Sequence, residues 1–297
     1  MNILISGASG LIGTALTRYF EQGGHRVIPL RRGVSAEPFS WQPDQGEINL
    51  DNSVTLDAVI NLAGPGVADK RWSAGRKQEI LGARVQATRL LSEELARREQ
   101  QPSVFLSASA IGFYGPRDDQ AVDEGTESGS GFLAEVARQW EQATAAAEAA
   151  GIRTVHTRFG IVLSAEGGAL KRMLLPFRLG LGGVIGSGRQ YMSWVDVGDA
   201  VRAMEFLIRD SDLSGPVNIV APRPVDNREF TRTLGRVLHR PALIPMPAFQ
   251  ARLLFGEMAE EILLTGVKVL PTRLAEAGFH FDKPELENAL TLLLARQ

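Results

Sequence analysis

The sequence predicts an α/β protein built on a doubly wound parallel sheet, a Rossmann fold, because short apolar runs alternate with helical patterns over the first 220 residues. A glycine-rich turn between the first apolar run and the first helical pattern supports this fold class. Continuous apolar strands separated by helices are typical of parallel sheets covered on both faces. The predicted strands are 2–6, 26–30, 58–64, 103–109, 152–160 and 216–222, and the predicted helices are 11–23, 73–98 and 131–150.

The pattern changes after about residue 165, where a glycine-rich stretch at 178–190 predicts an irregular loop. We therefore expect a dinucleotide-binding domain over 1–165, with 190–222 contributing to the sheet. Residues 166–189 and 223–297 are expected to form a smaller, mostly helical lobe on the substrate side.

Composition narrows the classes of partner and chemistry. The chain is 44% hydrophobic and its net charge of -2 gives no indication of nucleic acid or an anionic membrane as partner. The absence of cysteine excludes disulfides, thiolate zinc sites and cysteine nucleophiles, and the four histidines are too scattered to predict a metal site. Without a leader peptide or a long apolar run we expect a cytoplasmic protein, and its oligomeric state stays unknown.

The glycine motif ISGASGLIG is the strongest functional signal. Gly7 allows a tight turn, Gly10 lets a pyrophosphate approach the backbone, and Gly13 lets the helix pack on the strand. The helix that follows offers N–H groups to the phosphates. A turn that needs glycine only for its own backbone is the alternative. The predicted phosphate loop comprises Gly7, Ser9, Gly10, Leu11, Ile12 and Gly13.

The end of the second predicted strand indicates which cofactor binds. An NAD-preferring protein usually has an acidic residue there, whereas this chain has Arg31 and Arg32 and no acid until Glu37. Two guanidinium groups suit the 2′-phosphate of NADP(H) through charge-assisted hydrogen bonds. The alternative is a pair of solvated arginines at the end of a strand.

Three further segments complete a resemblance to a known superfamily. With the glycine loop, the stretches NLAG at 61–64, SASAIGFYG at 107–115 and RQYMSWVDVGDA at 189–200 resemble the extended short-chain dehydrogenase/reductases, which include nucleotide-sugar epimerases. The segment 256–279 resembles a narrower group, the YfcH-type "epimerase family" proteins. The resemblance covers essentially the whole chain and implies a small polar, nucleotide-linked substrate of unknown identity.

The resemblance also implies site residues. It places Arg189 on a substrate diphosphate, and Glu79 and Arg84 on a helix where they would reach a ribose hydroxyl and a phosphate or substrate anion. Two solvated side chains on that helix, and an ordinary surface arginine at 189, are the alternatives. The further cofactor-binding residues implied are Leu62, Ala63, Gly64, Glu79, Arg84, Ser107, Phe159, Gly160 and Ile161.

The departures from the superfamily concern its catalytic set of asparagine, serine, tyrosine and lysine. The tyrosine and lysine positions on the predicted helix 131–150 hold Leu133 and Ala137, and Arg84 falls at the asparagine position. The serine position is retained, at Ser109 rather than Ser107. Tyr114 is the other candidate proton donor, and its alternative role is a packed tyrosine with a bonded hydroxyl.

Two functions therefore remain open at this stage. The first is an NADP(H)-dependent oxidoreductase or epimerase that handles protons through Ser109, Tyr114 or water. The second is a catalytically silent NADP(H)-binding sensor or regulatory protein. The missing tyrosine–lysine pair favours the second, and the retained serine favours the first.

Overall fold

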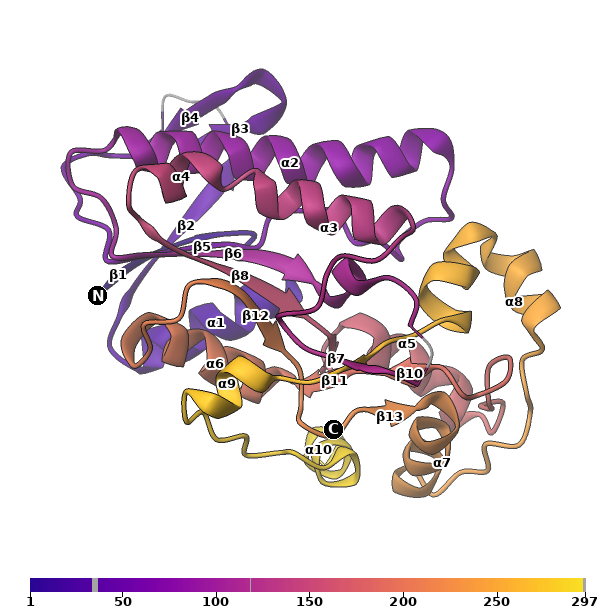
Figure 1. The fold of residues 1–297 in the computed structure, drawn as a ribbon. Helices are drawn as coiled ribbons and strands as arrows, with labels where there is room; N and C mark the ends of the chain where they lie inside the picture. The colour runs from indigo at the N-terminus through magenta and orange to yellow at the C-terminus, as the bar shows by residue number, and fades with distance from the viewer. Residues whose placement is uncertain (34–36, 118, 296–297) are drawn as a thin grey trace. The chain divides into compact units, whose positions relative to one another are not determined.

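The computed structural model describes residues 1–33, 37–117 and 119–295 (Figure 1). The chain divides into two compact units, each assembled from three separate segments. Unit 1 comprises Met1–Ala110, Val136–Arg158 and Met204–Val217, and unit 2 comprises Ile111–Glu135, Phe159–Ala203 and Asn218–Gln297.

Unit 1 is built on an eight-stranded, mostly parallel sheet in the order β12-β8-β6-β5-β1-β2-β3-β4. β1 pairs in parallel with β2 on one side and with β5 on the other, so the chain order reverses at β1. Ligands of such sheets bind beyond the carboxyl ends of the strands at this reversal. The strands are β1 (Asn2–Ser6), β2 (Arg26–Arg32), β3 (Ser40–Gln42), β4 (Glu47–Asn49), β5 (Ala58–Asn61), β6 (Val104–Ala110), β8 (Arg153–Phe159) and β12 (Gly215–Ile219).

Helices cover both faces of this sheet, as the alternating sequence pattern predicts. In Figure 1, α2 and α4 lie over one face and α1 lies under the other. A fully buried core of Leu4, Val59, Phe105 and Leu91 joins strands to α2. The helices are α1 (Leu11–Gln22), α2 (Ala74–Arg97), α3 (Phe132–Gln142), α4 (Ala145–Ala149) and α6 (Val197–Arg209), with a short 3-10 turn η1 (Pro43–Gln45).

Unit 2 is mostly helical and holds short strand pairs. β11 pairs in parallel with β9, β10 pairs antiparallel with β13, and β14 pairs in parallel with β7. Its strands are β7 (Ala121–Val122), β9 (Ile161–Leu163), β10 (Tyr191–Met192), β11 (Trp194–Asp196), β13 (Val225–Asp226) and β14 (Lys268–Val269). Its helices are α5 (Gly168–Arg178), α7 (Asn227–Val237), α8 (Ala248–Phe255), α9 (Thr272–Glu276) and α10 (Leu286–Leu294), with helical turns η2 (Ile111–Tyr114) and η3 (Ala259–Leu264).

The predicted doubly wound α/β class is confirmed, and the finer divisions differ from expectation. Residues 111–135 and 159–165, expected in the dinucleotide-binding domain, belong to unit 2. Of the segment 190–222, which was expected to contribute to the sheet, only 204–217 belongs to unit 1. Segment 111–135 joins unit 2 because Tyr114 and Val122 pack in one core with strand β14. The single helix expected over 131–150 is interrupted at Thr144, whose hydroxyl donates to the carbonyl oxygen of Glu141 at 2.7 Å.

No helix in the described part of the chain is long and apolar enough to cross a lipid bilayer.

Candidate functional site

Two glycines of the loop after β1 are required by packing within the protein. Gly7 has a φ of +70°, which disfavours any side chain, and a Cβ there would lie 2.9 Å from the carbonyl oxygen of Leu62. A Cβ at Gly13 would lie 2.2 Å from the carbonyl oxygen of Gly7. The first and third glycines therefore let α1 and the loop after β5 close on this turn.

Gly10 is less crowded than the other two, although a Cβ there would make one contact slightly tighter than an ordinary one. Its φ is -75°, and a Cβ would have a single neighbour, the Gly7 carbonyl oxygen, at 3.3 Å. Gly10 is the N-cap of α1, no side chain caps this end, and Ser9 beside it is exposed. Leu11 and Ile12 follow in the first turn, where helix N–H groups lack intrahelical partners. The space beside Gly10 is thus an open cradle at a positive helix end.

Two arginines end β2 at the same carboxyl edge. Both Arg31 and Arg32 are exposed. Arg32 lies 3.7 Å from the carboxylate of Asp44, with both side chains more than half exposed, and such pairs are weak. No described residue forms an ion pair with Arg31. These guanidinium groups are available to an anionic ligand.

The loop after β5 is fixed by a buried chain of hydrogen bonds. The hydroxyl of Ser6 donates to the side chain of Asn61 at 2.6 Å, and Asn61 donates to Thr88 on α2 at 2.7 Å. The indole N–H of Trp140 on α3 donates to the same Thr88 hydroxyl at 2.9 Å. The amide of Leu62 in turn donates to Ser6 at 3.2 Å, so the network sets the course of the loop.

Arg84 crosses the same loop from α2. Its guanidinium donates to the carbonyl oxygens of Pro65 at 2.8 Å and Ile80 at 3.0 Å, and it lies 5.0 Å from the ring centre of Trp140. No carboxylate within the described ranges lies at ion-pair distance. Burial, and secondarily the charge of Arg76, lowers the pKa of Arg84 to about 10. This buried cation favours an anion nearby.

Gly64 leaves room for that arginine. A Cβ at Gly64 would lie 3.1 Å from Arg84, which is tighter than an ordinary contact. Ala63, the preceding loop residue, is buried and donates its amide to Asn61 at 3.3 Å. Glu79, also on α2, forms an ion pair with Arg76 at 2.8 Å, and its side chain is half exposed. A bond from Glu79 to a ribose stays a prediction.

Ser107 and Ser109 face different surroundings on β6. The Ser107 hydroxyl is buried and has no hydrogen-bond partner among the residues that the structure describes. The Ser109 hydroxyl donates to the carboxylate of Glu141 at 2.6 Å. Since its only proton is committed, the Ser109 oxygen has just its remaining lone pairs to offer a ligand.

Glu141 is held by an arginine of β8. The Arg158 guanidinium donates to both carboxylate oxygens of Glu141, each at 2.8 Å, with both side chains at most 10% exposed. His156 lies near this cluster, bonded to Thr144 at 2.9 Å and to Glu148 at 3.1 Å. Glu141 was not among the site residues expected from the sequence. An acid on the apolar face of a helix was the signal that a buried cation must accompany it.

The Leu133 and Ala137 positions on α3 carry no titratable group. Ala137 is 2% exposed. The amides of Phe132 and Leu133 donate to the two carboxylate oxygens of Glu261 at 2.8 and 2.9 Å. Glu261 therefore caps the start of α3 from a residue 128 positions further along the chain, which no local pattern could indicate.

Tyr114 lies in the core of unit 2. It is fully buried, and its hydroxyl donates to the side-chain oxygen of Asn218 at 2.7 Å. Asn218 donates onward to the carbonyl oxygen of Leu270 at 2.9 Å. These contacts favour the packed, bonded alternative for Tyr114, and its catalytic role stays a prediction.

The remaining predicted site residues of unit 2 are Phe159, Gly160, Ile161 and Arg189. The first three lie where the chain packs closely against residues 193 and 219, and Arg189 lies on an exposed loop. The amides of Gly160 and Ile161 donate to carbonyl oxygens of Ile219 and Ser193, so their N–H groups are already engaged. Phe159, just before them, is 8% exposed. Arg189 is exposed, and no described residue forms an ion pair with it.

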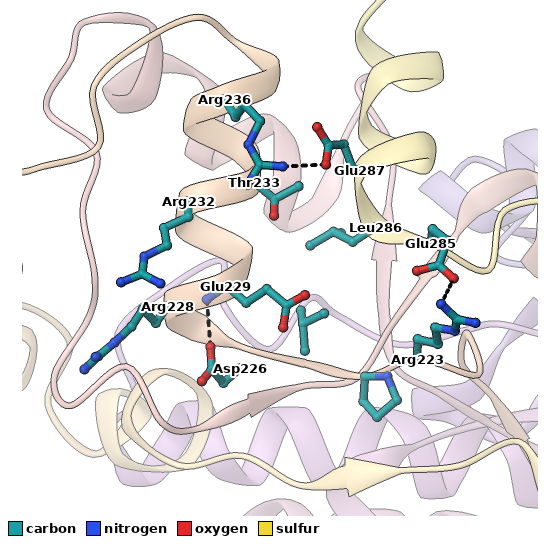
Figure 2. Close-up of a pocket in the computed structure, with 12 residues that line it drawn as sticks. Arg223, Asp226, Arg228, Glu229, Arg232, Thr233, Arg236, Glu285, Leu286 and Glu287 are labelled. Carbon is teal, nitrogen blue, oxygen red and sulfur yellow. Dashed lines mark hydrogen bonds and ion pairs between the residues drawn. The ribbon is translucent and has the colours of Figure 1, made fainter.

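A pocket of about 780 Å³ between α7 and α10 in unit 2 contains none of the sequence-predicted site residues. Figure 2 shows its rim, where Arg223 pairs with Glu285 and Arg236 pairs with Glu287. All four of these side chains are about half exposed or more, and such pairs hold little binding energy. We assign the pocket no role. Groups able to hold a metal ion are absent from the described residues.

The sheet, the glycine turn at its reversal point and the cradle beside Gly10 define a dinucleotide-binding protein of the Rossmann class. Residues 3–220 match the NAD dependent epimerase/dehydratase family, and the chain belongs to it. Residues 246–293 match a domain of unknown function, DUF1731.

Relatives match along nearly the whole chain. An epimerase family protein of Mycobacterium bovis is 42% identical over 97% of this chain and 96% of its own. The solved human epimerase family protein SDR39U1 with NADPH is 33% identical, with a TM-score of 0.89 and full coverage of both chains. A nucleoside-diphosphate sugar epimerase from Corynebacterium glutamicum is 32% identical, with a TM-score of 0.81 over all of this chain and 59% of its own.

Proposed function

We propose that this protein binds NADP(H) at the carboxyl edge of the unit 1 sheet and transfers hydride to or from a small polar substrate. The observation that carries the proposal is the cradle beside Gly10. Packing explains Gly7 and Gly13, whereas Gly10 leaves space into which a ligand would fit. The amides of Leu11, Ile12 and Gly13 at the uncapped helix end suit a pyrophosphate in that space.

The preference for NADP(H) rests on Arg31 and Arg32. Both guanidinium groups are exposed at the end of β2, and a 2′-phosphate accepts charge-assisted, often bidentate bonds from such groups. The human relative, 33% identical over the full chain, was solved with NADPH.

Other residues of unit 1 would hold the remainder of the cofactor. The backbone of Leu62, Ala63 and Gly64 would lie along the adenosine ribose, and Arg84 would place its cation near a phosphate. The Ser107 hydroxyl, buried and otherwise unpartnered in the described chain, would gain a bond on binding. Glu79 could keep its bond to Arg76 through one carboxylate oxygen while the other oxygen accepts from a ribose hydroxyl. A bond from the carboxamide to the backbone at Phe159, Gly160 or Ile161 stays a prediction.

When bound, NADP(H) would supply hydride exchange at its nicotinamide. Proton handling falls to Ser109 among the candidates, because Leu133 and Ala137 cannot titrate and the Tyr114 hydroxyl is bonded in a core. The Ser109 proton is directed to Glu141, so the Ser109 oxygen accepts a hydrogen bond and fits a substrate hydroxyl. Proton transfer would then pass from the substrate to Ser109 as the serine proton moves to Glu141.

The substrate class that we propose is nucleotide-linked. The Corynebacterium relative is described as a nucleoside-diphosphate sugar epimerase. Arg189 in unit 2 is an exposed guanidinium suited to a diphosphate.

A catalytically silent sensor is the second candidate function. The observation that favours it is that both predicted catalytic hydroxyls, on Ser109 and Tyr114, already donate to side chains of the protein. Such a protein would bind NADP(H) as tightly and turn over nothing.

One experiment separates these possibilities. The protein is titrated with NADPH and NADH by fluorescence, and then NADPH oxidation is followed with a panel of nucleotide-linked keto sugars. We expect binding that favours NADPH, and turnover that falls about 10²–10⁴-fold in Ser109→Ala. Binding without turnover would select the sensor, and no binding of either nucleotide would refute both functions.

A further inference from the structure

Unit 2 exposes a group of large apolar side chains on two segments. One is α5 with the turn that follows it, and the other is α8 with the segment that leads into it. The two segments are 168–183 and 239–256, and the turn after α5 lies beside residues 240–244. The amide of Ile244 donates to the carbonyl oxygen of Gly182 at 3.1 Å, and Arg240 donates to the carbonyl oxygen of Arg178 at 3.1 Å. We call these two segments the α5–α8 patch.

The apolar exposure of the α5–α8 patch is unusual for this molecule. Of the ten large apolar side chains found exposed in the described residues, eight belong to it. Leu243 and Leu253 are 81% and 72% exposed. Contiguous exposure of this kind marks an interaction surface, unlike scattered single residues. The eight are Leu175, Leu179, Leu181, Leu243, Ile244, Phe249, Leu253 and Leu254.

Within the two segments the lysine and arginine residues have no acidic counterpart, and Arg252 forms an ion pair with Glu260 just outside them. The chain as a whole carries a net charge of -2, yet these two segments contain five basic residues and no acidic residue. On α5 the exposed positions combine Lys171, Arg172 and Arg178 with Leu175 and Leu179 on one helical face. The remaining two basic residues are Arg240 and Arg252.

The charge decides between possible occupants. A self-complementary contact with a second copy would set the basic residues of α5 and Arg240 against their own copies, which opposes association. An anionic membrane surface matches both properties, because its headgroups attract the arginines and lysine while its acyl chains accept leucines without demanding a fixed shape.

We propose that the α5–α8 patch docks this protein reversibly on anionic lipid surfaces. The composition of the whole chain gave no indication of a membrane partner, because acidic residues elsewhere mask this local excess of positive charge. No described helix is long and apolar enough to span a bilayer, so docking would be peripheral. The apolar side chains of α8 would enter the interface, and the basic residues of α5 would face the headgroups.

The test uses the full chain and extruded vesicles of phosphatidylcholine with 30% phosphatidylglycerol, prepared at about 10 mM salt, against vesicles of phosphatidylcholine alone. We expect the protein to sediment with the anionic vesicles only, and to be released as salt rises and screens the charges. Lys171→Glu should lower the partition coefficient about fivefold or more, the effect of one basic residue near such a surface.

Matched variants locate the contact. Phe249→Asp with Leu253→Asp should abolish sedimentation, whereas Leu292→Asp, at an exposed leucine of α10 outside the patch, should keep it. Thermal melting confirms that the variants are folded. Absence of binding to anionic vesicles, or equal binding by the double variant, would overturn the proposal. The proposal would also be overturned if the wild type were a dimer, the double variant were a monomer, and both bound the vesicles equally.

Discussion

The loop between β1 and α1 can be compared with the helix α3. The loop leaves open space and backbone N–H groups for a ligand, whereas the side chains of α3 at the usual tyrosine and lysine positions are apolar. In the loop, Gly10 keeps a space that protein packing does not require. In α3, Leu133 and Ala137 carry no proton, and Glu141 is held by Arg158 and Ser109. The comparison teaches that the glycine loop can keep its open space while the usual tyrosine–lysine pair is absent and a buried ion pair lies beside the retained serine.

The largest expected effect is on stability, and it tests whether the ion pair between Glu141 of α3 and Arg158 of β8 holds the fold together. Arg158→Ala would leave the buried carboxylate of Glu141 without its cation, so the free energy of unfolding should fall by about 3–5 kcal/mol. Urea denaturation measures this change. Arg138→Ala, at an exposed position of the same helix, is the control and should change stability by less than about 1 kcal/mol. Equal losses in both variants would show that Glu141 does not depend on Arg158.

Next in size is the effect of the arginines beside the cradle. Hydrogen bonds to charged groups contribute about 1.5–3 kcal/mol each, so replacing Arg31 and Arg32 by alanine should weaken NADPH binding tenfold to several hundredfold. Affinity for NADH, which lacks the 2′-phosphate, should hardly change. Arg26→Ala at the opposite end of the same strand is the control, and a similar loss of NADPH affinity there would contradict the assignment.

A smaller effect probes the link between the two regions. Thr88 receives hydrogen bonds from both Trp140 on α3 and Asn61 at the end of β5. Thr88→Val would leave these two buried donors unsatisfied, and stability should fall by about 1–3 kcal/mol. Thr88→Ser keeps the hydroxyl and should restore most of that loss in chemical denaturation. If valine and serine behave alike, the hydroxyl does not connect α3 to the loop.

The smallest expected effect concerns Glu124 in unit 2, which accepts the amide of Asn218 at 2.9 Å, beside the Tyr114 hydroxyl bond. Burial raises the pKa of this carboxyl above its ordinary value of 4.5 in the folded state. A raised pKa stabilises the fold at pH below the ordinary value, and this contribution is lost as pH rises through the folded-state pKa.

Glu124→Gln should therefore remove part of the pH dependence. Between pH 4 and pH 8, the wild type should lose stability relative to the variant, because only the wild type has a carboxyl group that ionises there. If the melting temperatures of wild type and variant change with pH in the same way across that range, burial does not perturb the pKa of Glu124.

Much of the fold follows from periodicity, because long apolar strands and amphipathic helices carry their pattern locally. The six predicted strands all occur in the large sheet. The hairpin of β3 and β4 was missed because SWQ and EIN are too short for alternation to register. The break in the expected helix at Thr144 depends on a hydroxyl bond to a carbonyl oxygen, which apolar spacing does not reveal.

Local sequence is enough for a site prediction where one residue type serves one chemistry. Glycines between a strand and a helix predict a phosphate loop, and paired arginines at a strand end predict a 2′-phosphate, and both stay predictions. The partners of Ser109 and Leu133 were not predictable, because Glu141 and Glu261 reach them across 32 and 128 residues. Only tertiary packing brings such pairs together.

The central claim is that the space beside Gly10 receives a pyrophosphate, and a titration of wild type and Gly10→Val with NADPH tests it most directly. The branched side chain would fill the cradle, while the φ of -75° suits any residue and the protein offers only one tight contact, 3.3 Å from a Cβ to the Gly7 carbonyl oxygen. We therefore expect the variant to fold. We predict that wild type binds NADPH and that the variant loses at least about 100-fold in affinity, a change of roughly 2.7 kcal/mol. An unchanged melting temperature would show that the variant is folded. Binding of NADPH by folded Gly10→Val at wild-type affinity would contradict the account.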